Sequence, residues 1–369
     1  MKSQRILAMS AVCGALAFGL AACGDDDDSG TTTASGTESG QSSLSGSIAG
    51  AGASSQAAAK EAWIAGFQTA NGDVTVSYDP VGSGGGREQF IAGGTAFGGT
   101  DSAFKEDELA DAQKRCGGPD NLIQLPVYIS PIAIIYNLDG VENLQLSPET
   151  LAKVLKQDIK KWNDPAIAAD NPDAELPDTA ITVVNRSDES GTTENLQEYL
   201  SAVAGDTWDF EVSGDWPVKG GEAAQGTSGV VEAVGSGSGT IGYADASQAG
   251  DLGVATIKVG DEFVAPTPEA AAAVVEASKQ NDDAGKFGFT YELARDTDAS
   301  GAYPIVLISY EMACTQYDSP EEAALVKAFL GYEISPEGQE AAAKAAGSAP
   351  ISDALRTKFQ PAIDAIGAQ

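Results

Sequence analysis

Residues 186–193, Arg-Ser-Asp-Glu-Ser-Gly-Thr-Thr, combine side chains that can hold a small anion. The strand-like stretch 181–185 precedes them, and Leu196 and Leu200 follow at helical spacing. This pattern is typical of a turn that leaves a strand and begins a helix. Such a turn offers a guanidinium, hydroxyls and free helix-start amides, which together suit a tetrahedral oxyanion. The alternative is a helix cap whose arginine forms a surface ion pair.

A second turn of the same kind occurs earlier in the chain. Residues 74–78 alternate apolar and polar side chains as a half-buried strand does, and the run 82–86, Gly-Ser-Gly-Gly-Gly, follows. A helix is predicted over 87–92. Glycines allow the backbone to approach a ligand closely. A flexible linker has the same composition, and the missing Gly-Lys-Ser/Thr excludes a nucleotide P-loop.

Composition narrows the classes of function. The 369 residues, 42% of them hydrophobic, suffice for one large or two medium domains, and the formal net charge is −33. That charge argues against nucleic acid or an anionic membrane surface as the main partner. The chain contains no histidine, which excludes Ser-His-Asp and Cys-His catalysis and histidine-ligated metals.

The first residues have the features of an export signal. Lys2 and Arg5 form a basic start, residues 6–20 are mostly apolar, and Leu-Ala-Ala-Cys closes the segment at Cys23. The apolar core is too short for a standard transmembrane helix. The closing tetrapeptide resembles a bacterial lipobox, which implies a signal peptide over 1–22 and lipidation of Cys23. An ordinary signal peptide with an incidental cysteine is the alternative.

After the signal, residues 23–43 are rich in Asp, Ser, Gly and Thr and have little to bury, so we expect a disordered tether behind the lipidated cysteine. From residue 44 the pattern is globular. Once the signal peptide with Cys13 is removed and Cys23 carries lipid, Cys116 and Cys314 remain. In an exported protein two such cysteines are expected to form a disulfide.

Strand and helix patterns alternate along the chain, which predicts an α/β fold with mainly parallel sheets. Three helix starts carry a hydroxyl cap before a proline, at residues 147–150, 267–269 and 319–322. The other strand candidates are 123–126, 132–137, 240–243 and 305–310.

The chain resembles the substrate-binding lipoproteins of bacterial phosphate ABC importers. The resemblance runs from residue 44 nearly to the end, with its motifs in the family's order. These motifs are Gly-Ala-Gly-Ala-Ser-Ser at 50–55, the glycine run at 82–86, Phe-Gly-Gly-Thr-Asp at 97–101, Lys-Trp-Asn-Asp-Pro-Ala-Ile at 161–167, the turn at 186–193, and Gly-Thr-Ile-Gly-Tyr at 239–243.

The resemblance implies a periplasmic-binding-protein (Venus flytrap) fold, with two lobes that close on phosphate about a two-strand hinge. The first lobe would comprise 44–134 and 305–369, and the second 135–304. The crossing strands would be 131–137 and 303–310. Cys116 and Cys314 would both fall in or near the first lobe, which agrees with a disulfide between them.

The resemblance also assigns roles in the site. Ser54, Ser55 and Ser83 match loops that donate to the ligand. Asp101 matches the carboxylate that accepts a hydrogen bond from the ligand's own proton. The remaining matches lie in the turn at 186–193, where a charged clamp, Arg186, is held by Asp188, and the other donors are Ser190, Gly191 and Thr192.

Several readings stay open beside this one. Glu189 stands where the family usually has glycine, and we expect its side chain to point to solvent, although a carboxylate there could weaken anion binding. Asp101 could instead cap a helix beginning near Glu106, and Ser83 could be a plain turn residue. Sulfate, molybdate or tungstate is the rival ligand class, but these ions are fully ionised and would present only lone pairs to Asp101.

The function implied is capture of extracytoplasmic phosphate and delivery to the permease subunits of an ABC importer. The implied protein is a monomer held to the outer face of the cytoplasmic membrane by lipid alone, without cofactor, metal, nucleic acid or catalytic residues. A secreted phosphatase would need a nucleophile with a base, or a metal cluster. A phosphate sensor or adhesin on the same fold is a further alternative.

Overall fold

The computed structural model describes residues 44–281 and 285–368. Its main sheet has ten strands, eight of them in the order β2-β1-β3-β15-β4-β8-β6-β7, with β9 and β13 also paired to β4. The predicted signal peptide, Cys23 and the tether lie outside the described residues. Among the described residues, no helix combines the length and apolar character needed to cross a membrane.

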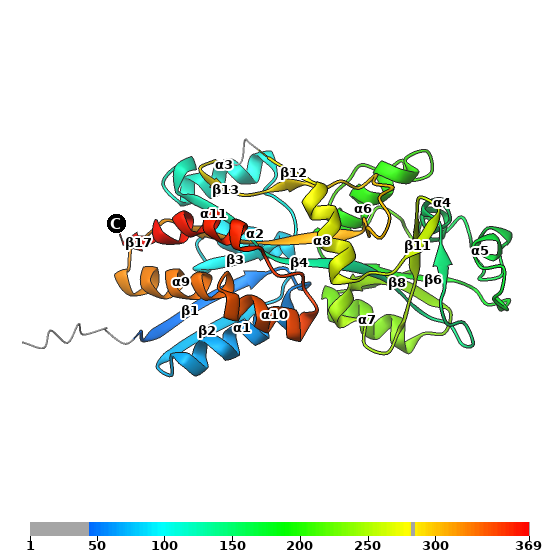
Figure 1. The fold of residues 1–369 in the computed structure, drawn as a ribbon, viewed down its shortest axis with the longest axis horizontal. Coiled ribbons are helices and arrows are strands. Elements are labelled where there is room, and N and C mark those ends of the chain that lie inside the picture. The colour runs from blue at the N-terminus through cyan, green and yellow to red at the C-terminus, as the bar shows by residue number, and fades with distance from the viewer. Residues whose placement is uncertain (1–43, 282–284, 369) are drawn as a thin grey trace, which may run out of the picture. The chain divides into compact units, whose positions relative to one another are not determined.

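One half of the sheet, with the helices around it, is called here the first lobe (Figure 1). Its elements from the early chain are β1 (Gly46–Gly52), α1 (Ala57–Ala70), β2 (Val74–Asp79), α2 (Ser83–Ile91), β3 (Phe97–Thr100) and α3 (Glu106–Arg115). Its elements from the end of the chain are β15 (Val306–Cys314), α9 (Pro320–Glu333), α10 (Pro336–Ala346) and α11 (Asp353–Asp364), with the short pair β16 (Gln316–Tyr317) and β17 (Gly367–Ala368).

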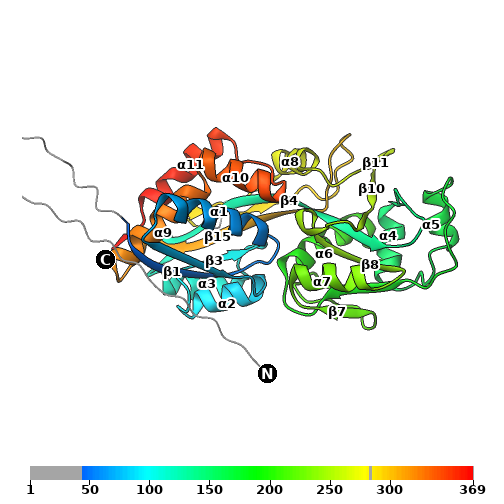
Figure 2. The same cartoon turned by 90° about the horizontal axis from the view of Figure 1, so that it is seen from below.

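The other half of the sheet belongs to the second lobe (Figure 2). Its elements are β5 (Gln145–Leu146), α4 (Pro148–Leu155), α5 (Pro165–Asp170), β6 (Thr182–Arg186), α6 (Gly191–Ala204), β7 (Glu222–Ala224), α7 (Gly226–Ser236), β8 (Thr240–Asp245), β9 (Gly253–Val254), β10 (Thr256–Val259) and β11 (Glu262–Val264). The chain then returns through α8 (Pro268–Ala277), β12 (Lys279–Gln280), β13 (Phe287–Gly288) and β14 (Tyr291–Glu292).

The strand β4 (Leu122–Asn137) links the two lobes. Residues 122–131 pair with β15, whereas Ile132 begins the pairing with β8, so the partner changes between Pro131 and Ile132. The sequence predicted two separate strands here, 123–126 and 132–137. The strand is continuous because both halves are mostly apolar and every residue before Asn137 is buried, and Pro126 and Pro131 stand where β15 pairs on one side only.

The predicted α/β class is confirmed, and most predicted elements occur within a few residues of their expected bounds. The sheet is mixed and not mainly parallel, because β4 pairs antiparallel with both β15 and β8. Thr267 and Ser319 accept hydrogen bonds from the backbone of the first turns of α8 and α9, as caps do, whereas the Ser147 side chain makes no such bond at the start of α4. One segment departs from the predicted division into lobes. Strand β13 falls in the range assigned to the second lobe but pairs with Ile123 and Gln124, in the first-lobe half of β4.

The predicted disulfide is confirmed, because Cys116 and Cys314 are bonded, with their Cα atoms 5.1 Å apart. The bond joins the end of α3 to the end of β15 across 198 positions of sequence. In the chain-entropy model, a loop of this length contributes on the order of 5 kcal/mol by restricting the unfolded chain. The disulfide therefore ties the early and late segments of the first lobe together.

A buried ionic cluster lies in the core of the first lobe. Lys60 contacts the carboxylates of Glu311, at 2.7 Å, and Glu333, and all three side chains are at most 1% exposed. Four aromatic rings surround the ammonium group at 5.0–5.3 Å. Burial raises the pKa of Glu311 to about 8 and also raises the pKa of Glu333. One lysine thus faces two carboxyl groups, one of which keeps its proton near neutral pH.

We expect this cluster to make the protein less stable as the pH rises from about 5 to about 8. A carboxyl whose pKa is raised by folding binds its proton more tightly in the folded state than in the unfolded state. Its contribution to the free energy of unfolding is therefore complete at low pH and is lost as the pH rises through the folded-state pKa. Buried Asp245, with a pKa raised to about 7, acts in the same direction. The free energy of unfolding in urea, measured across this range, should fall by a few kcal/mol.

The variant Glu333→Gln is the matched control for this pH dependence. It leaves a single carboxylate beside Lys60, so the pKa of Glu311 should drop and the pH dependence should flatten. A free energy of unfolding that rises between pH 5 and 8, or a slope unchanged in the variant, would contradict the assignment.

Candidate functional site

Four helices begin at the junction of the two lobes, two from each lobe. In the first lobe α1 follows Ser54 and Ser55, and α2 begins at Ser83. In the second lobe α6 begins at Gly191, after β6, and α7 begins at Gly226, after β7. Each start presents backbone N–H groups that lack partners within the helix and carries the positive end of the helix dipole. The junction therefore favours an anion.

The helix α2 was expected to begin at Arg87 but begins four residues earlier, inside the glycine run. Its N-cap residue, Gly82, has φ +97°, a conformation that side chains with a Cβ rarely adopt. This turn lets the chain leave β2 and enter the helix at once. The Ser83 hydroxyl consequently lies in the first turn, where it accepts a hydrogen bond from the Asp101 amide at 3.1 Å.

Asp101 lies in the loop after β3 and is 3% exposed. Its Oδ1 accepts from the Ser55 hydroxyl at 2.7 Å, and its Oδ2 accepts from the Thr192 hydroxyl of the second lobe at 3.0 Å. Burial raises the pKa of Asp101, although hydrogen bonds from Ser55, Ser309 and Thr192 and the charge of Arg186 oppose that shift. Helix α3 begins at Glu106 with Lys105 as its N-cap, so Asp101 is not the cap of that helix.

Arg186 ends β6 with a side chain that is 2% exposed. Its Nε donates to Asp188 Oδ1 at 2.8 Å, and its Nη2 donates to Asp188 Oδ2, which forms a two-point ion pair. Burial alone would raise the pKa of Asp188, but the hydrogen bonds and charge of Arg186 outweigh this effect and lower the pKa of this carboxyl. The guanidinium is close to the α2 turn, since a Cβ on Gly82 would lie 3.4 Å from Nη2. The guanidinium is therefore buried and its partner half-buried, and the surface ion pair considered for Arg186 is wrong.

The turn that follows brings the two lobes into direct contact. Ser190 caps α6 by accepting from the Thr193 amide at 3.3 Å. Gly191 must be glycine, because a Cβ there would lie 2.7 Å from both the Asp101 Cβ and the Ser83 Oγ. Across the junction the Ser54 hydroxyl bonds to Thr227 at the start of α7. All nine residues predicted for the site thus lie around one junction.

The Glu189 side chain does not point to solvent as expected. Its Oε1 accepts from Arg87 Nη2 at 2.9 Å and from Lys105 Nζ, and both of these residues belong to the first lobe. The hydrogen bond that Lys105 donates to Glu189 is the main cause that raises the pKa of Lys105. The expectation was wrong because both cations come from segments distant in sequence, and the residues of the turn alone do not indicate that these segments lie nearby.

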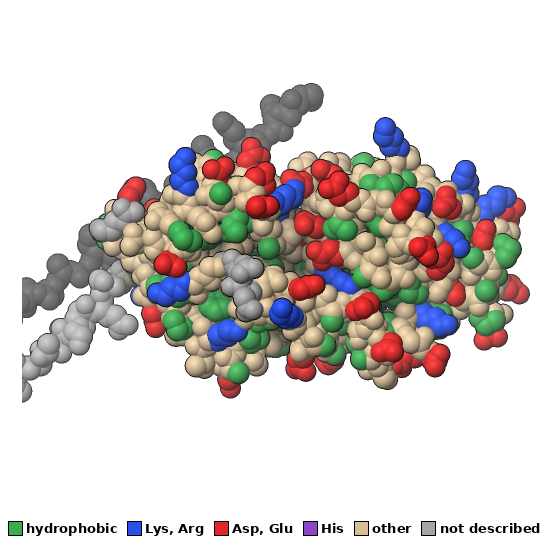
Figure 3. Space-filling view, turned by 90° about the horizontal axis from the view of Figure 1, so that it is seen from above, with side chains coloured by type: hydrophobic (Ala, Val, Ile, Leu, Met, Phe, Trp, Pro, Cys, Tyr) green, Lys and Arg blue, Asp and Glu red, His purple; other side chains and the backbone are tan. Residues whose placement is uncertain are grey.

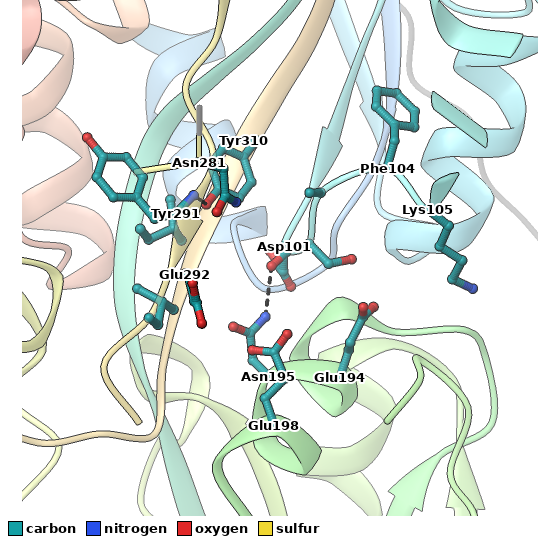
Figure 4. Close-up of a pocket in the computed structure, with 14 residues that line it drawn as sticks. Asp101, Phe104, Lys105, Glu194, Asn195, Glu198, Asn281, Tyr291, Glu292 and Tyr310 are labelled. Atoms are coloured by element: carbon teal, nitrogen blue, oxygen red, sulfur yellow. Dashed lines mark hydrogen bonds between the residues drawn. The ribbon is translucent and has the colours of Figure 1, made fainter. Parts of the chain in front are cut away.

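Sequence reasoning missed several residues that support the site. Asn195 donates to the Asp101 carbonyl at 2.7 Å and to the Gly191 carbonyl at 2.8 Å, so it joins the two loops (Figure 4). The Tyr243 hydroxyl bonds to Thr193 and accepts from the Arg186 amide. A usable signal existed for Thr227, because Gly-Thr-Ser-Gly at 226–229 repeats the strand-to-helix turns found at the other two loops.

A cavity of about 340 Å³ lies beside Asp101 (Figure 4). Its lining includes Glu194, Glu198 and Glu292, and burial raises the pKa of Glu194. Acidic side chains also spread over the outer face of both lobes (Figure 3). Charges farther than a Debye length of about 8–10 Å are screened, whereas the donors at the junction act at contact. An anion can therefore be held locally in an acidic protein.

Fold and site together indicate a two-lobed binding protein whose candidate anion site lies between its lobes. The model of the PBP superfamily domain matches residues 31–337. Phosphate-binding protein PstS 3 of Mycobacterium tuberculosis is 36% identical over 382 residues, covering 99% of this chain and all of that protein. The chain therefore belongs to the family of phosphate-binding proteins of the PBP superfamily, which confirms the resemblance found in the sequence.

More distant proteins agree with the fold. Phosphate-binding protein PstS of Haemophilus influenzae is 33% identical over 303 residues, covering 80% of this chain and 86% of that protein. Among solved structures, a phosphate-binding protein from Stenotrophomonas maltophilia superposes with a TM-score of 0.67 at 19% identity, covering 86% of this chain and 93% of that one. A high affinity periplasmic phosphate-binding protein bound with phosphate gives 0.70 at 22% identity, with 86% and 93% covered.

Proposed function

We propose that this protein binds inorganic phosphate outside the cytoplasm and delivers it to the permease subunits of an ABC importer. The observation that carries the proposal is the buried Asp101 carboxylate, set among hydroxyl donors and opposite the buried Arg186. The guanidinium and the helix starts attract an oxyanion. The Asp101 carboxylate also requires the bound anion to carry a proton. Each carboxylate oxygen can accept a further hydrogen bond from the anion but cannot donate one to it.

This requirement separates phosphate from its rivals. Near neutral pH phosphate retains one or two protons, whereas sulfate, molybdate and tungstate have none to offer. With those ions Asp101 would be left as a buried charge facing a like charge, which costs several kcal/mol. The names of the family members, which are phosphate-binding proteins, support the same choice. Phosphate is therefore the ligand proposed for Ser54, Ser55, Ser83, Asp101, Arg186, Asp188, Ser190, Gly191 and Thr192.

We infer a binding role without catalysis, cofactor or metal. The relatives are binding proteins, and the chain has no histidine to serve as a base. Asp188 is engaged by Arg186 and Asp101 by two hydroxyls, so neither is placed to activate a nucleophile. The acidic net charge, −33, argues against nucleic acid as a partner.

We propose that two bodies move relative to each other. The first comprises residues 44–134 and 305–369, and the second comprises residues 135–304. Two observations support these boundaries: strand β4 changes its pairing between Pro131 and Ile132, and β15 begins at Val306. Segment 287–289 is an exception, since β13 and the Phe289 amide bond to the first-lobe half of β4. The protein is proposed to act as a monomer, one copy supplying both halves of the site.

Delivery to an importer is tested by uptake in the native host. Deleting the gene should reduce uptake of labelled phosphate at low external concentration, and the wild-type gene should restore it while an Arg186→Ala gene should not. Normal uptake in the deletion strain, with phosphate binding by the purified protein intact, would favour the sensor or adhesin alternative.

The lipid anchor is tested separately at Cys23. The lipobox-like segment and the polar run behind it support anchoring on the outer face of the cytoplasmic membrane, with the lipid as the sole membrane contact. We expect Cys23→Ala to abolish incorporation of labelled fatty acid and to release the protein or leave its precursor unprocessed. Lipid labelling of that variant at the wild-type level would refute the assignment.

A further inference from the structure

Glu189 lies between two residues of the proposed phosphate site, Asp188 and Ser190. Its side chain extends from the second lobe to the first. It meets two cations of the first lobe, Arg87 and Lys105. Its side chain is 32% exposed, and that of Arg87 is 1% exposed. This carboxylate is therefore part of a contact between the lobes and is not a free charge beside the anion.

Arg87 is held in place by the first lobe alone. Its Nε donates to Glu108 at 2.9 Å, and its Nη1 donates to the hydroxyls of Thr100 and Ser102 at 3.0 and 3.1 Å. Its Nη2 is left facing the other lobe, where it donates to Glu189 at 2.9 Å. A guanidinium fixed in this way loses little further side-chain freedom when the second lobe arrives.

The backbone of Glu189 also contacts the first lobe. The Gly84 amide donates to the Glu189 carbonyl at 3.2 Å. A Cβ on Gly84 would lie 2.5 Å from the Glu189 Oε2, so the missing side chain gives the carboxylate its place beside α2. Lys105 adds a more exposed ion pair from the start of α3. Both the backbone and the side chain of Glu189 thus rest on the first lobe.

We propose that Glu189 is a positioning residue for the ligand, a clamp that holds the turn at 188–190 against the first lobe when the lobes are closed. The proposal rests on the proposed function, since its effect is read through phosphate. Every contact of the Glu189 side chain named above crosses from one lobe to the other, so those contacts are lost when the lobes separate. Interactions present only in the closed form raise ligand affinity by favouring that form.

The clamp and a simple charge effect predict opposite signs. A carboxylate that only repelled the anion would weaken phosphate binding, so its neutralisation would tighten binding. A clamp favours the closed form, so its neutralisation weakens binding and speeds release. The two cations also offset the charge of Glu189, which removes most of the reason for repulsion.

The test compares the wild type with Glu189→Gln by titration calorimetry with inorganic phosphate, and by stopped-flow measurement of phosphate release. One charged hydrogen bond between partly buried groups corresponds to roughly a tenfold change in affinity. We expect Glu189→Gln to bind phosphate about tenfold more weakly, with most of the change in the release rate. Lys105→Gln should have a smaller effect because its ion pair is exposed. Glu211→Gln, an exposed second-lobe carboxylate, should match the wild type.

Ionic strength provides a readout that a purely structural role would not move. Salt screens the exposed Lys105–Glu189 pair more than the pair that Glu189 forms with buried Arg87, so the advantage of the wild type over Glu189→Gln should shrink in part as sodium chloride is raised. Equal or tighter phosphate binding by Glu189→Gln at low salt would overturn the clamp. Absence of phosphate binding by the wild type would instead overturn the proposed function, so the two failures are distinguishable. Circular dichroism of each variant checks folding.

Discussion

Replacing Arg186 by alanine is expected to weaken phosphate binding about thirtyfold or more. The guanidinium is buried, and both its Nε and its Nη2 are fixed by Asp188, so it is already oriented before any ligand arrives. Removing it takes away a charge-assisted partner of the anion and also leaves the half-buried Asp188 without its counter-ion. Truncating one member of such a pair costs about 2–5 kcal/mol, which corresponds to about thirtyfold to several thousandfold in affinity.

Companion variants separate these two causes. Arg186→Lys keeps the charge but loses the two-point geometry, and it should lie between the wild type and Arg186→Ala. The double variant Arg186→Met with Asp188→Asn removes the stranded carboxylate, so it should recover part of the lost affinity. Calorimetry with phosphate measures all three. A dissociation constant for Arg186→Ala within about threefold of the wild type would remove Arg186 from the site.

Replacing Asp101 by asparagine is expected to narrow the preference for phosphate over sulfate by orders of magnitude. The carboxylate is nearly inaccessible to solvent and accepts hydrogen bonds from Ser55 and Thr192, so it presents acceptors to any bound anion. A protonated phosphate oxygen can donate to it, but sulfate cannot. An unsatisfied buried charge costs several kcal/mol, and about 1.4 kcal/mol corresponds to tenfold in affinity.

Asparagine supplies a donor in place of the charge, so the variant should gain sulfate binding more than it loses phosphate binding. Titrating both anions into the wild type and Asp101→Asn gives the ratio of the two affinities. Ser55→Ala is a useful control, because it removes one donor to Asp101 but keeps the carboxylate, and it should leave the preference for phosphate largely intact. An unchanged ratio in Asp101→Asn would show that Asp101 has no part in specificity.

Local pattern was enough to predict two of the loops that meet at the junction. The turns at 82–86 and 186–193 each join a strand to a helix, and both contribute side chains at the junction. The family resemblance added Ser54, Ser55 and Asp101, which have no strong local signal. The Cys116–Cys314 disulfide followed from the count of cysteines left after export.

Other features depend on contacts between distant segments and had no local signal. Arg87 and Glu189 are 102 positions apart, and nothing in either turn indicates that they meet. The three members of the buried cluster, Lys60, Glu311 and Glu333, come from α1, β15 and α9, and a charged residue in such elements is ordinarily expected at the surface. The continuity of β4 likewise depends on β15 and β8, which pair with its two halves.

The central claim, that the junction selects a protonated oxyanion, is tested most directly by competition calorimetry on the wild-type protein at neutral pH. One phosphate should bind per chain. Sulfate at a thousandfold excess should leave the apparent dissociation constant for phosphate essentially unchanged. Equal binding of sulfate and phosphate, or displacement of phosphate by that excess of sulfate, would contradict the account.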